Sequence, residues 1–113
     1  MHKTFDIIVF GATGFTGRLV AEYLHTTYGV GRSVVWAMAG RSLEKLTRVR
    51  DELGIGTALP LLVADASDSE ALAQLVAQAR VVITTVGPYQ RHGQPLVDAC
   101  AKAGTDYVDL CGE

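Results

Sequence analysis

Residues 5–20 read FDIIVFGATGFTGRLV, which joins an apolar run to a glycine-rich turn. Residues 5–10 are apolar except for Asp6, and their length and Ile/Val content predict a strand buried on both faces. From residue 15 to residue 28 apolar side chains recur at helical spacing, and Gly29 ends that pattern. The stretch therefore predicts a strand, a tight turn and a helix in succession.

The rest of the chain repeats this alternation of strand and helix. Further strands are predicted at residues 33–39, 60–64, 80–86 and 105–110. Helices are predicted from a cap at Ser42 to near Gly54, at residues 69–78 and at residues 95–102. Strands that alternate with helices form right-handed crossovers between parallel neighbours. We therefore predict an α/β fold of Rossmann type, with three α/β/α layers and a parallel sheet in the order 3-2-1-4-5.

Composition limits what a chain of this size does. Its 113 residues suffice for one domain. The formal net charge is −2 and the charged residues are interspersed, so the sequence gives no sign of a basic surface that would bind nucleic acid or anionic lipid. Apolar residues make up 49% and charged residues only 19%, which indicates a surface that is partly covered in the whole protein. No apolar run approaches the ~20 residues of a membrane-spanning helix, and residues 1–10 lack a signal peptide's apolar stretch, so a cytoplasmic location is expected.

The positions of the two cysteines indicate neither metal binding nor a disulfide. Cys100 and Cys111 have no nearby Cys or His partner at metal-ligand spacing. Neither a zinc site nor a disulfide framework is indicated, and we expect reduced thiols with packing roles.

The glycine-rich turn carries the main chemical signal, because it lies where a strand ends and a helix begins. In that position a pyrophosphate can bind exposed backbone N–H groups at the helix N-terminus. We expect Gly11 to form the turn, Gly14 to let the backbone approach the phosphates, and Gly17 to let the helix pack closely on the strand. The predicted pyrophosphate contacts are Gly11, Thr13, Gly14, Phe15, Thr16 and Gly17.

Two alternatives to this interpretation exist. A P-loop needs Lys and then Ser or Thr after its last glycine, but Arg18 and Leu19 follow Gly17, so ATP or GTP chemistry is disfavoured. The spacing G-x-x-G-x-x-G instead resembles the loop of reductases and short-chain dehydrogenases. The other alternative is that the glycines only form a tight connection.

The end of the second predicted strand selects the dinucleotide. NAD sites usually place a carboxylate there for the adenosine ribose, but this chain has Gly40, Arg41 and Ser42, with no acid before Glu44. Arg41 is suited to pair with a 2'-phosphate or to stack on adenine, and Ser42 adds a hydroxyl donor. We therefore predict NADP(H) in preference to NAD(H). The alternative is a solvated Arg41 beside a Ser42 that only caps the next helix.

Two more strand ends point to the same crevice. Asp65 and Ala66 follow the third strand at the expected adenine edge, although Asp65 is equally suited to cap the next helix. Val86, Gly87 and Pro88 follow the fourth strand, at the topological switch point beside the first strand. The nicotinamide half of the cofactor is expected there, and Gly87 either contacts it or only ends the strand.

Four blocks together carry a family resemblance: residues 11–17, residues 39–42 (AGRS), residues 86–89 (VGPY) and residues 107–113 (YVDLCGE). They resemble the N-terminal domain of saccharopine dehydrogenase-like oxidoreductases, a group that includes trans-acting enoyl reductases. The resemblance spans essentially the whole chain, and the last two blocks are its most specific part. It implies NADP-linked reduction of an enoyl-acyl or imine-type substrate, without deciding between them.

In that family a large substrate domain follows the nucleotide domain. We therefore expect residues 1–113 to be an NAD(P)-binding Rossmann domain truncated before a C-terminal substrate domain. Such a fragment would not complete a catalytic cycle alone, and its oligomeric state stays open.

Catalytic residues are not assigned by the sequence. No Tyr-x-x-x-Lys occurs, so the catalytic pair of short-chain dehydrogenases is absent. Tyr89 and His92, on the loop after the fourth strand, are weak candidates for proton donors, because such loop residues commonly pack or cap. Asp109 and Glu113, at the end of the last strand, either face substrate or hold the second domain.

The leading hypothesis is thus an NADP(H)-binding domain that supports hydride transfer. The alternative is a non-catalytic NADP-sensing regulatory module of the NmrA-like kind, which uses the same loop without turnover. A sugar-nucleotide epimerase or reductase is a weaker third possibility, against which the VGPY and YVDL blocks argue.

Overall fold

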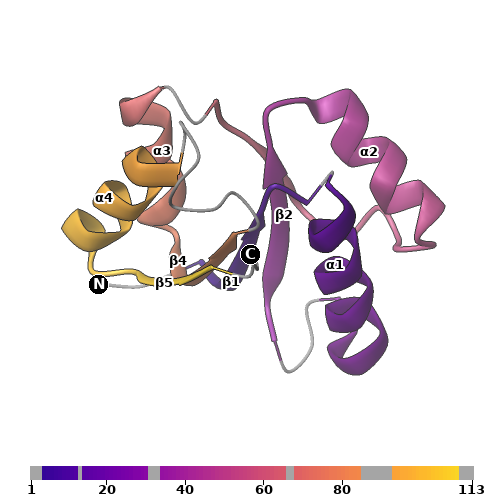
Figure 1. Cartoon of the computed structure of the whole chain (residues 1–113). Helices are drawn as coiled ribbons and strands as arrows, with labels where there is room; N and C mark the ends of the chain where they lie inside the picture. Colours follow the sequence, from indigo (N-terminus) through magenta and orange to yellow (C-terminus); the bar gives the residue numbers. More distant parts are fainter. Residues whose placement is uncertain (1–3, 13, 31–33, 66–67, 85–92, 110–113) are drawn as a thin grey trace.

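The computed structural model describes residues 4–12, 14–30, 34–65, 68–84 and 93–109. Strands and helices alternate through these residues (Figure 1). In chain order they are β1 (Phe5–Phe10), α1 (Phe15–Tyr28), β2 (Trp36–Gly40), α2 (Leu43–Glu52), β3 (Leu61–Val63), α3 (Ser69–Val76), β4 (Ala79–Thr84), α4 (Gly93–Ala103) and β5 (Asp106–Asp109).

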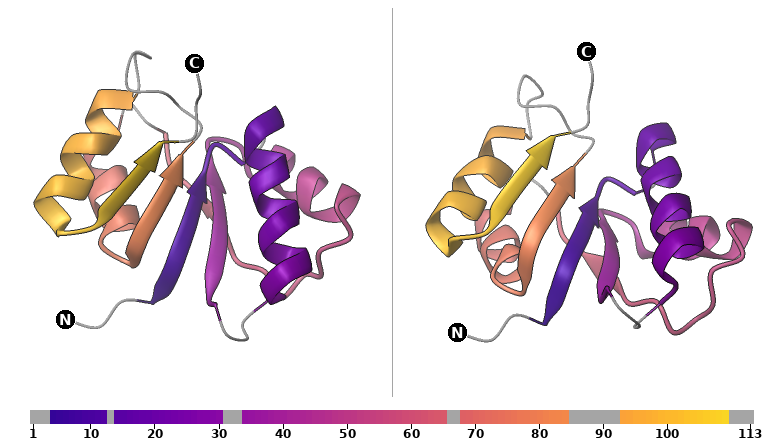
Figure 2. Two further views of the ribbon diagram at one scale, coloured as in Figure 1. Left: turned by 60° about the horizontal axis from the view of Figure 1, so that its bottom comes forward. Right: turned by 90° about the horizontal axis from the view of Figure 1, so that it is seen from below.

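The five strands form one parallel sheet in the order β3-β2-β1-β4-β5, which confirms the predicted topology. β1 is central, with Ile8 in register with Ala37 of β2 on one side and Val82 of β4 on the other. α1 and α2 lie on one face of the sheet, and α3 and α4 lie on the other (Figures 1 and 2). The predicted three-layer α/β/α arrangement is therefore confirmed.

Alternation along β1 divides the core into two halves. Ile8 packs into the cluster on the α3/α4 side, which includes Leu72 and Leu96. Its neighbour Val9 packs into the cluster on the α1/α2 side with Leu46. Ile8 and Val9 both have no exposed surface, as expected for a strand buried on both faces.

The start of β2 differs from the predicted boundary. Hydrogen-bonded strand geometry begins at Trp36, so the described residues Val34 and Val35 precede the strand. The Val35 amide donates to the Asp6 carboxylate at 2.9 Å, while the Val35 carbonyl accepts from the Asp6 amide at 2.7 Å. The Asp6 carboxylate thus accepts the hydrogen bond that the Val35 amide would otherwise donate in strand pairing. The sequence pattern does not reveal this contact.

The boundaries between α3 and β5 also differ from the predicted ones by one or two residues. α3 ends at Val76 rather than at 78, because the Gln78 amide bonds the Leu75 carbonyl in a tighter turn and the Gln78 carbonyl accepts from Phe5. The buried Thr105 hydroxyl lies 2.8 Å from the Val76 carbonyl and 3.1 Å from that of Ala79. This side chain links the end of α3 to the start of β4, and β5 begins one residue later.

α4 also begins at Gly93, two residues before the predicted start.

Among the described residues no helix is long and apolar enough to cross a membrane, and no cluster of three or more His, Cys, Asp or Glu side chains could hold a metal ion. Cys100 is a free thiol in the core, and burial raises its pKa to about 11.

Candidate functional site

The candidate site begins where β1 leaves the sheet. The Gly11 amide still bonds the Ala39 carbonyl of β2 at 3.0 Å, and Gly11 then adopts a φ of +84°. The Gly14 amide bonds back to the Gly11 carbonyl at 3.1 Å and closes the turn. Because this left-handed φ costs an ordinary L-residue roughly 1–2 kcal/mol, the turn itself favours glycine at position 11.

The first turn of α1 has no side-chain cap. Its N-cap is Gly14, and its first turn contains no acidic residue. By contrast, α2 is capped by Ser42 with Glu44 in its first turn, and α3 is capped by Asp68 with Glu70. The N–H groups at the start of α1 and the positive end of its dipole are therefore left for an acceptor from outside the helix.

Gly14 is not required by the fold. Its φ of −81° and ψ of 170° suit any residue, and it is exposed. A Cβ built there would lie 3.6 Å from the Gly11 carbonyl oxygen, an ordinary contact. The open space over Gly14 is therefore available to a ligand.

Gly17 has the opposite character. A Cβ there would overlap the Gly11 carbonyl oxygen and would lie 2.7 Å from the Ala12 Cα. Both neighbours are backbone atoms, so the close packing of α1 on the turn depends on the missing side chain. Thr16, between these glycines, is half-buried.

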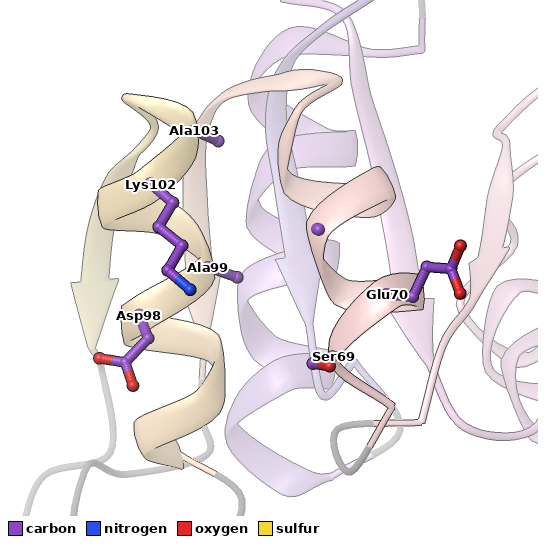
Figure 3. A pocket seen from close by; sticks show the side chains of 7 residues that line it. Ser69, Glu70, Asp98, Ala99, Lys102 and Ala103 are labelled. Carbon is purple, nitrogen blue, oxygen red and sulfur yellow. The ribbon is translucent and has the colours of Figure 1, made fainter.

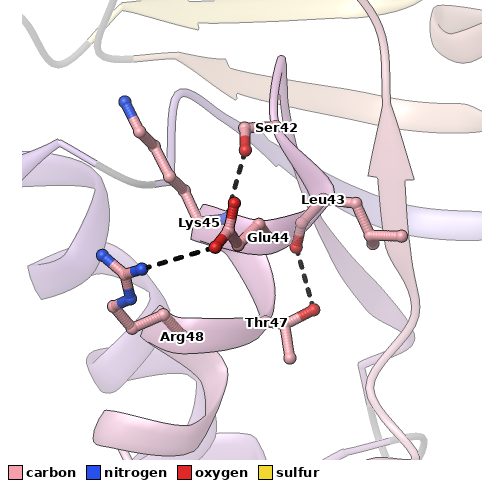
Figure 4. A network of polar contacts seen from close by, with 6 residues as sticks. All are labelled: Ser42, Leu43, Glu44, Lys45, Thr47 and Arg48. Atoms are coloured by element: carbon pink, nitrogen blue, oxygen red, sulfur yellow. Dashed lines mark hydrogen bonds and ion pairs between the residues drawn. The ribbon is translucent and has the colours of Figure 1, made fainter.

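The end of β2 presents positive charge. Arg41 is exposed directly after Gly40, and its guanidinium has no hydrogen-bond or ion-pair partner within the described parts of the chain. The Ser42 hydroxyl oxygen accepts from the Lys45 amide at 3.2 Å, so Ser42 caps α2 while its proton remains available (Figure 4).

The start of α2 adds a cation that sequence inspection overlooked. Lys45 is exposed, four residues after Arg41. Glu44, the only acid in this turn, lies 3.8 Å from Arg48 one turn further along the helix (Figure 4). No sequence pattern marked this pair, because Arg41 precedes the helix and Lys45 lies in its first turn, and together they leave this corner positively charged.

The end of β3 adjoins that corner, because the Ala64 amide bonds the Gly40 carbonyl at 2.9 Å. Asp65 follows and is exposed. Its predicted alternative role as a helix cap is wrong, since the Asp68 carboxylate accepts from the Ala71 amide at 3.1 Å and caps α3. The Asp65 carbonyl instead accepts from the Asp68 amide at 2.9 Å.

The end of β4 meets β1 at the switch point, where Thr84 is in register with Phe10 and is fully buried. Asp109 closes β5 beside it. Several predicted site residues lie outside the described parts of the chain, namely Thr13, Ala66, Val86, Gly87, Pro88, Tyr89, His92 and Glu113.

A groove of about 570 Å³ lies between α3 and α4, lined by Ser69, Glu70, Ala73, Asp98, Ala99, Lys102 and Ala103 (Figure 3). Small alanines form its floor, and the Glu70 side chain points away from α4. None of its lining residues belongs to the glycine-rich turn or to a strand end, so the groove is separate from the candidate site.

A parallel sheet in this order, with an uncapped glycine-rich turn after its first strand, defines a dinucleotide-binding domain of Rossmann type. A family model described as the saccharopine dehydrogenase NADP-binding domain matches residues 7–112. The chain therefore belongs to the saccharopine dehydrogenase NADP-binding domain family. The family's cofactor agrees with the predicted NADP(H), and the predicted resemblance is confirmed.

Curated relatives include a trans-acting enoyl reductase of Mycobacterium tuberculosis (strain ATCC 25618 / H37Rv), 54% identical over 99% of this chain and 26% of the relative. The trans-acting enoyl reductase of Mycobacterium leprae (strain TN) is 52% identical over 98% of this chain and 26% of the relative. The chain thus spans about a quarter of the length of these relatives.

Among solved structures, apo saccharopine dehydrogenase (L-Glu forming) from Saccharomyces cerevisiae superposes with a TM-score of 0.73. It is 22% identical, over 93% of this chain and 21% of that chain. A short-chain dehydrogenase/reductase from Veillonella parvula DSM 2008, in complex with NADP, has a TM-score of 0.68 at 21% identity over 96% of this chain and 46% of that chain. These likenesses show the fold.

Proposed function

We propose that this domain binds NADP(H) for an oxidoreductase whose remaining polypeptide supplies the substrate site. The observation that carries the proposal is the uncapped start of α1, with exposed Gly14 beside amides that have no capping side chain. A diphosphate is an acceptor of the right charge for these amides. The cradle over Gly14, which a Cβ would partly fill, fits this group.

Each part of the cofactor has a proposed set of contacts. The glycine-rich turn, with Gly11, Thr13, Gly14, Phe15, Thr16 and Gly17, would hold the pyrophosphate through backbone amides. Arg41 and Ser42 would bind the 2'-phosphate, and Lys45 would add charge to the same corner. Asp65 and Ala66 would border the adenine, while Val86, Gly87 and Pro88 would border the nicotinamide half.

The relatives support the reaction class. When bound, NADP(H) supplies or accepts a hydride, and the described residues of this chain bind and orient it. The relatives that are more than half identical are named trans-acting enoyl reductases, which favours an enoyl-type substrate for the whole protein over an imine. The proton donor is not assigned, and Tyr89 and His92 remain weak candidates.

A binding experiment on the full-length protein tests the proposal. Calorimetric titration with NADPH and NADH should show tighter binding of NADPH, because Arg41 and Lys45 offer positive charge and the end of β2 carries no carboxylate for the ribose. The full-length protein should also oxidise NADPH in the presence of an enoyl thioester. Failure to bind either nucleotide would overturn the proposal, and equal affinities would overturn the NADP(H) preference.

A further inference from the structure

One face of the sheet is only partly covered. α3 and α4 cover one face, whereas on the other face α1 and α2 lie over the β1–β3 half (Figure 2). Among the described residues no helix packs on that second face over β4 and β5. Parallel sheets are almost always covered on both faces, because their backbones and apolar side chains are buried from each side. The uncovered half therefore needs a partner.

The side chains on this half are apolar toward the carboxyl ends of the strands, whereas Asp106, at the start of β5, is exposed on the same face. Val82 packs into the α3/α4 cluster, so the alternation of β4 turns Ile83 to the opposite face. On β5, Tyr107 packs against the same cluster and Val108 faces the other way, 40% exposed. Ile83 and Val108 are register partners, so they lie side by side on the uncovered face.

The flank of α1 beside this half is also apolar. Leu19 is 51% and Tyr23 60% exposed, and both line a groove of about 450 Å³ whose floor includes Ile7 and Ile83. The opposite flank of α1 carries Arg18, which is paired with Glu52 of α2 at 2.7 Å. α1 is therefore fastened to α2 on one flank and presents large apolar side chains on the other.

These residues form one surface, which we call the open face: Ile7, Leu19, Tyr23, Ile83 and Val108. Single exposed apolar side chains need no explanation, but a contiguous set over sheet strands that none of the described helices covers indicates an interface. The relatives show where an occupant would come from, because this chain spans only 26% of their length. A segment of the same polypeptide also has a higher effective concentration than a second molecule.

We propose that the open face is a docking surface for an apolar helix from the remainder of the full-length polypeptide, which packs over β4 and β5 beside α1. The inference rests on the proposed function in one respect, namely that this domain is part of a longer enzyme. It adds the surface through which the domain is attached and the apolar character of the segment that binds there.

Thiol labelling tests the proposal with the 113-residue chain and the full-length protein, both without nucleotide. Leu19→Cys on α1 and Val108→Cys on β5 place thiols on the open face. Glu22→Cys is the matched control, since Glu22 is exposed on α1 next to Tyr23 but does not line the groove. Peptide mass spectrometry after a maleimide pulse scores each position separately from the native cysteines.

We expect the thiols at positions 19 and 108 to react at least about tenfold more slowly in the full-length protein than in the 113-residue chain, while position 22 reacts equally in both. Equal rates at all three positions would show that the open face stays bare and would overturn the proposal. Protection that appears in the 113-residue chain and grows with its concentration would assign the face to a second copy, and would overturn it as well.

NADPH titration of the same full-length preparations separates this inference from the proposed function. Unprotected thiols in a protein that binds NADPH would contradict only the docking surface. Protected thiols in a protein that binds no nucleotide would contradict only the proposed function.

Discussion

Among single residues of the glycine-rich turn, Gly17 is needed for folding and Gly14 leaves room for a ligand. Gly17 is needed by the protein itself, because a Cβ would lie 2.7 Å from the Ala12 Cα and overlap the Gly11 carbonyl. Gly14 has ordinary torsion angles and room for a Cβ. The close helix packing expected of Gly17 is therefore present, and the open space over Gly14 leaves room for the phosphates that the motif predicts there.

We predict that Gly14→Ala weakens NADPH binding by at least about tenfold, because the new methyl group lies where the diphosphate approaches the amides. Its effect on the free energy of unfolding should stay within about 1 kcal/mol, since alanine accepts these torsion angles. Calorimetry on the full-length protein measures the first quantity.

Gly17→Ala is the matched comparison. Its Cβ meets backbone atoms that cannot rotate away, so we expect a loss of about 1–3 kcal/mol in the free energy of unfolding. Urea unfolding of the 113-residue chain, followed by the emission of its single tryptophan, Trp36, measures both variants. If Gly14→Ala binds NADPH normally, the diphosphate does not approach over Gly14.

Arg41 determines the expected cofactor preference. Arg41→Asp removes a cation and adds a charge that repels a 2'-phosphate, so the ratio of NADPH to NADH affinity should fall by at least about tenfold. Arg80→Asp, which changes the net charge by the same two units, is the control, because Arg80 lies on β4 and faces Asp6 at 3.5 Å. An unchanged ratio in Arg41→Asp would mean that Arg41 is only a solvated cation.

At the scale of elements, Cys100 makes the packing of α4 sensitive to pH. Burial raises the pKa of its thiol from 9.0 to about 11. The folded protein therefore keeps a proton that the unfolded chain loses above pH 9. This stabilising contribution is fully present below pH 9 and is lost as the pH rises to 11.

We predict that the free energy of unfolding falls between pH 9 and pH 11 in the native chain and in Cys100→Ala. The fall should be larger in the native chain, by up to about 3 kcal/mol. The comparison between the two proteins removes the contribution of lysines and tyrosines that titrate in the same range. Urea unfolding at several pH values, again followed by Trp36, measures the difference. Parallel pH profiles for the two proteins would show that the thiol ionises equally in both states.

Sequence patterns predicted the elements better than their ends. The apolar run before Gly11 and the helical repeat after it matched β1 and α1 residue for residue. The start of β2 was missed because the Asp6 side chain takes the Val35 amide. The alternative role of Asp65 as the cap of α3 was wrong, because Asp68, three residues later, also has a carboxylate suited to a cap and accepts from the Ala71 amide.

At the scale of the whole molecule, strand order made the candidate site predictable. A parallel sheet brings the carboxyl ends of all its strands to one edge, so residues far apart in sequence converge without any pairwise signal. Side-chain hydrogen bonds and charge balance carried no such signal, which is why Lys45 was overlooked and the open face was foreseen only as a surface low in charge.

This topology also predicts where NADPH changes the protein. In the full-length protein, bound NADPH should slow amide hydrogen exchange at residues 14–18 and 40–45, by about tenfold or more at saturation. Residues 29–30 and 56–58 are the internal control, because they lie together in a groove formed by the far end of α1 and the segment after α2. NADPH is not expected to contact these residues, so their hydrogen exchange should stay unchanged.

Hydrogen exchange measured by mass spectrometry at subsaturating and saturating NADPH tests this prediction. Protection of residues 29–30 and 56–58 without protection of the glycine-rich turn would place the nucleotide away from the carboxyl ends of the strands. That result would contradict the site proposed at the start of α1.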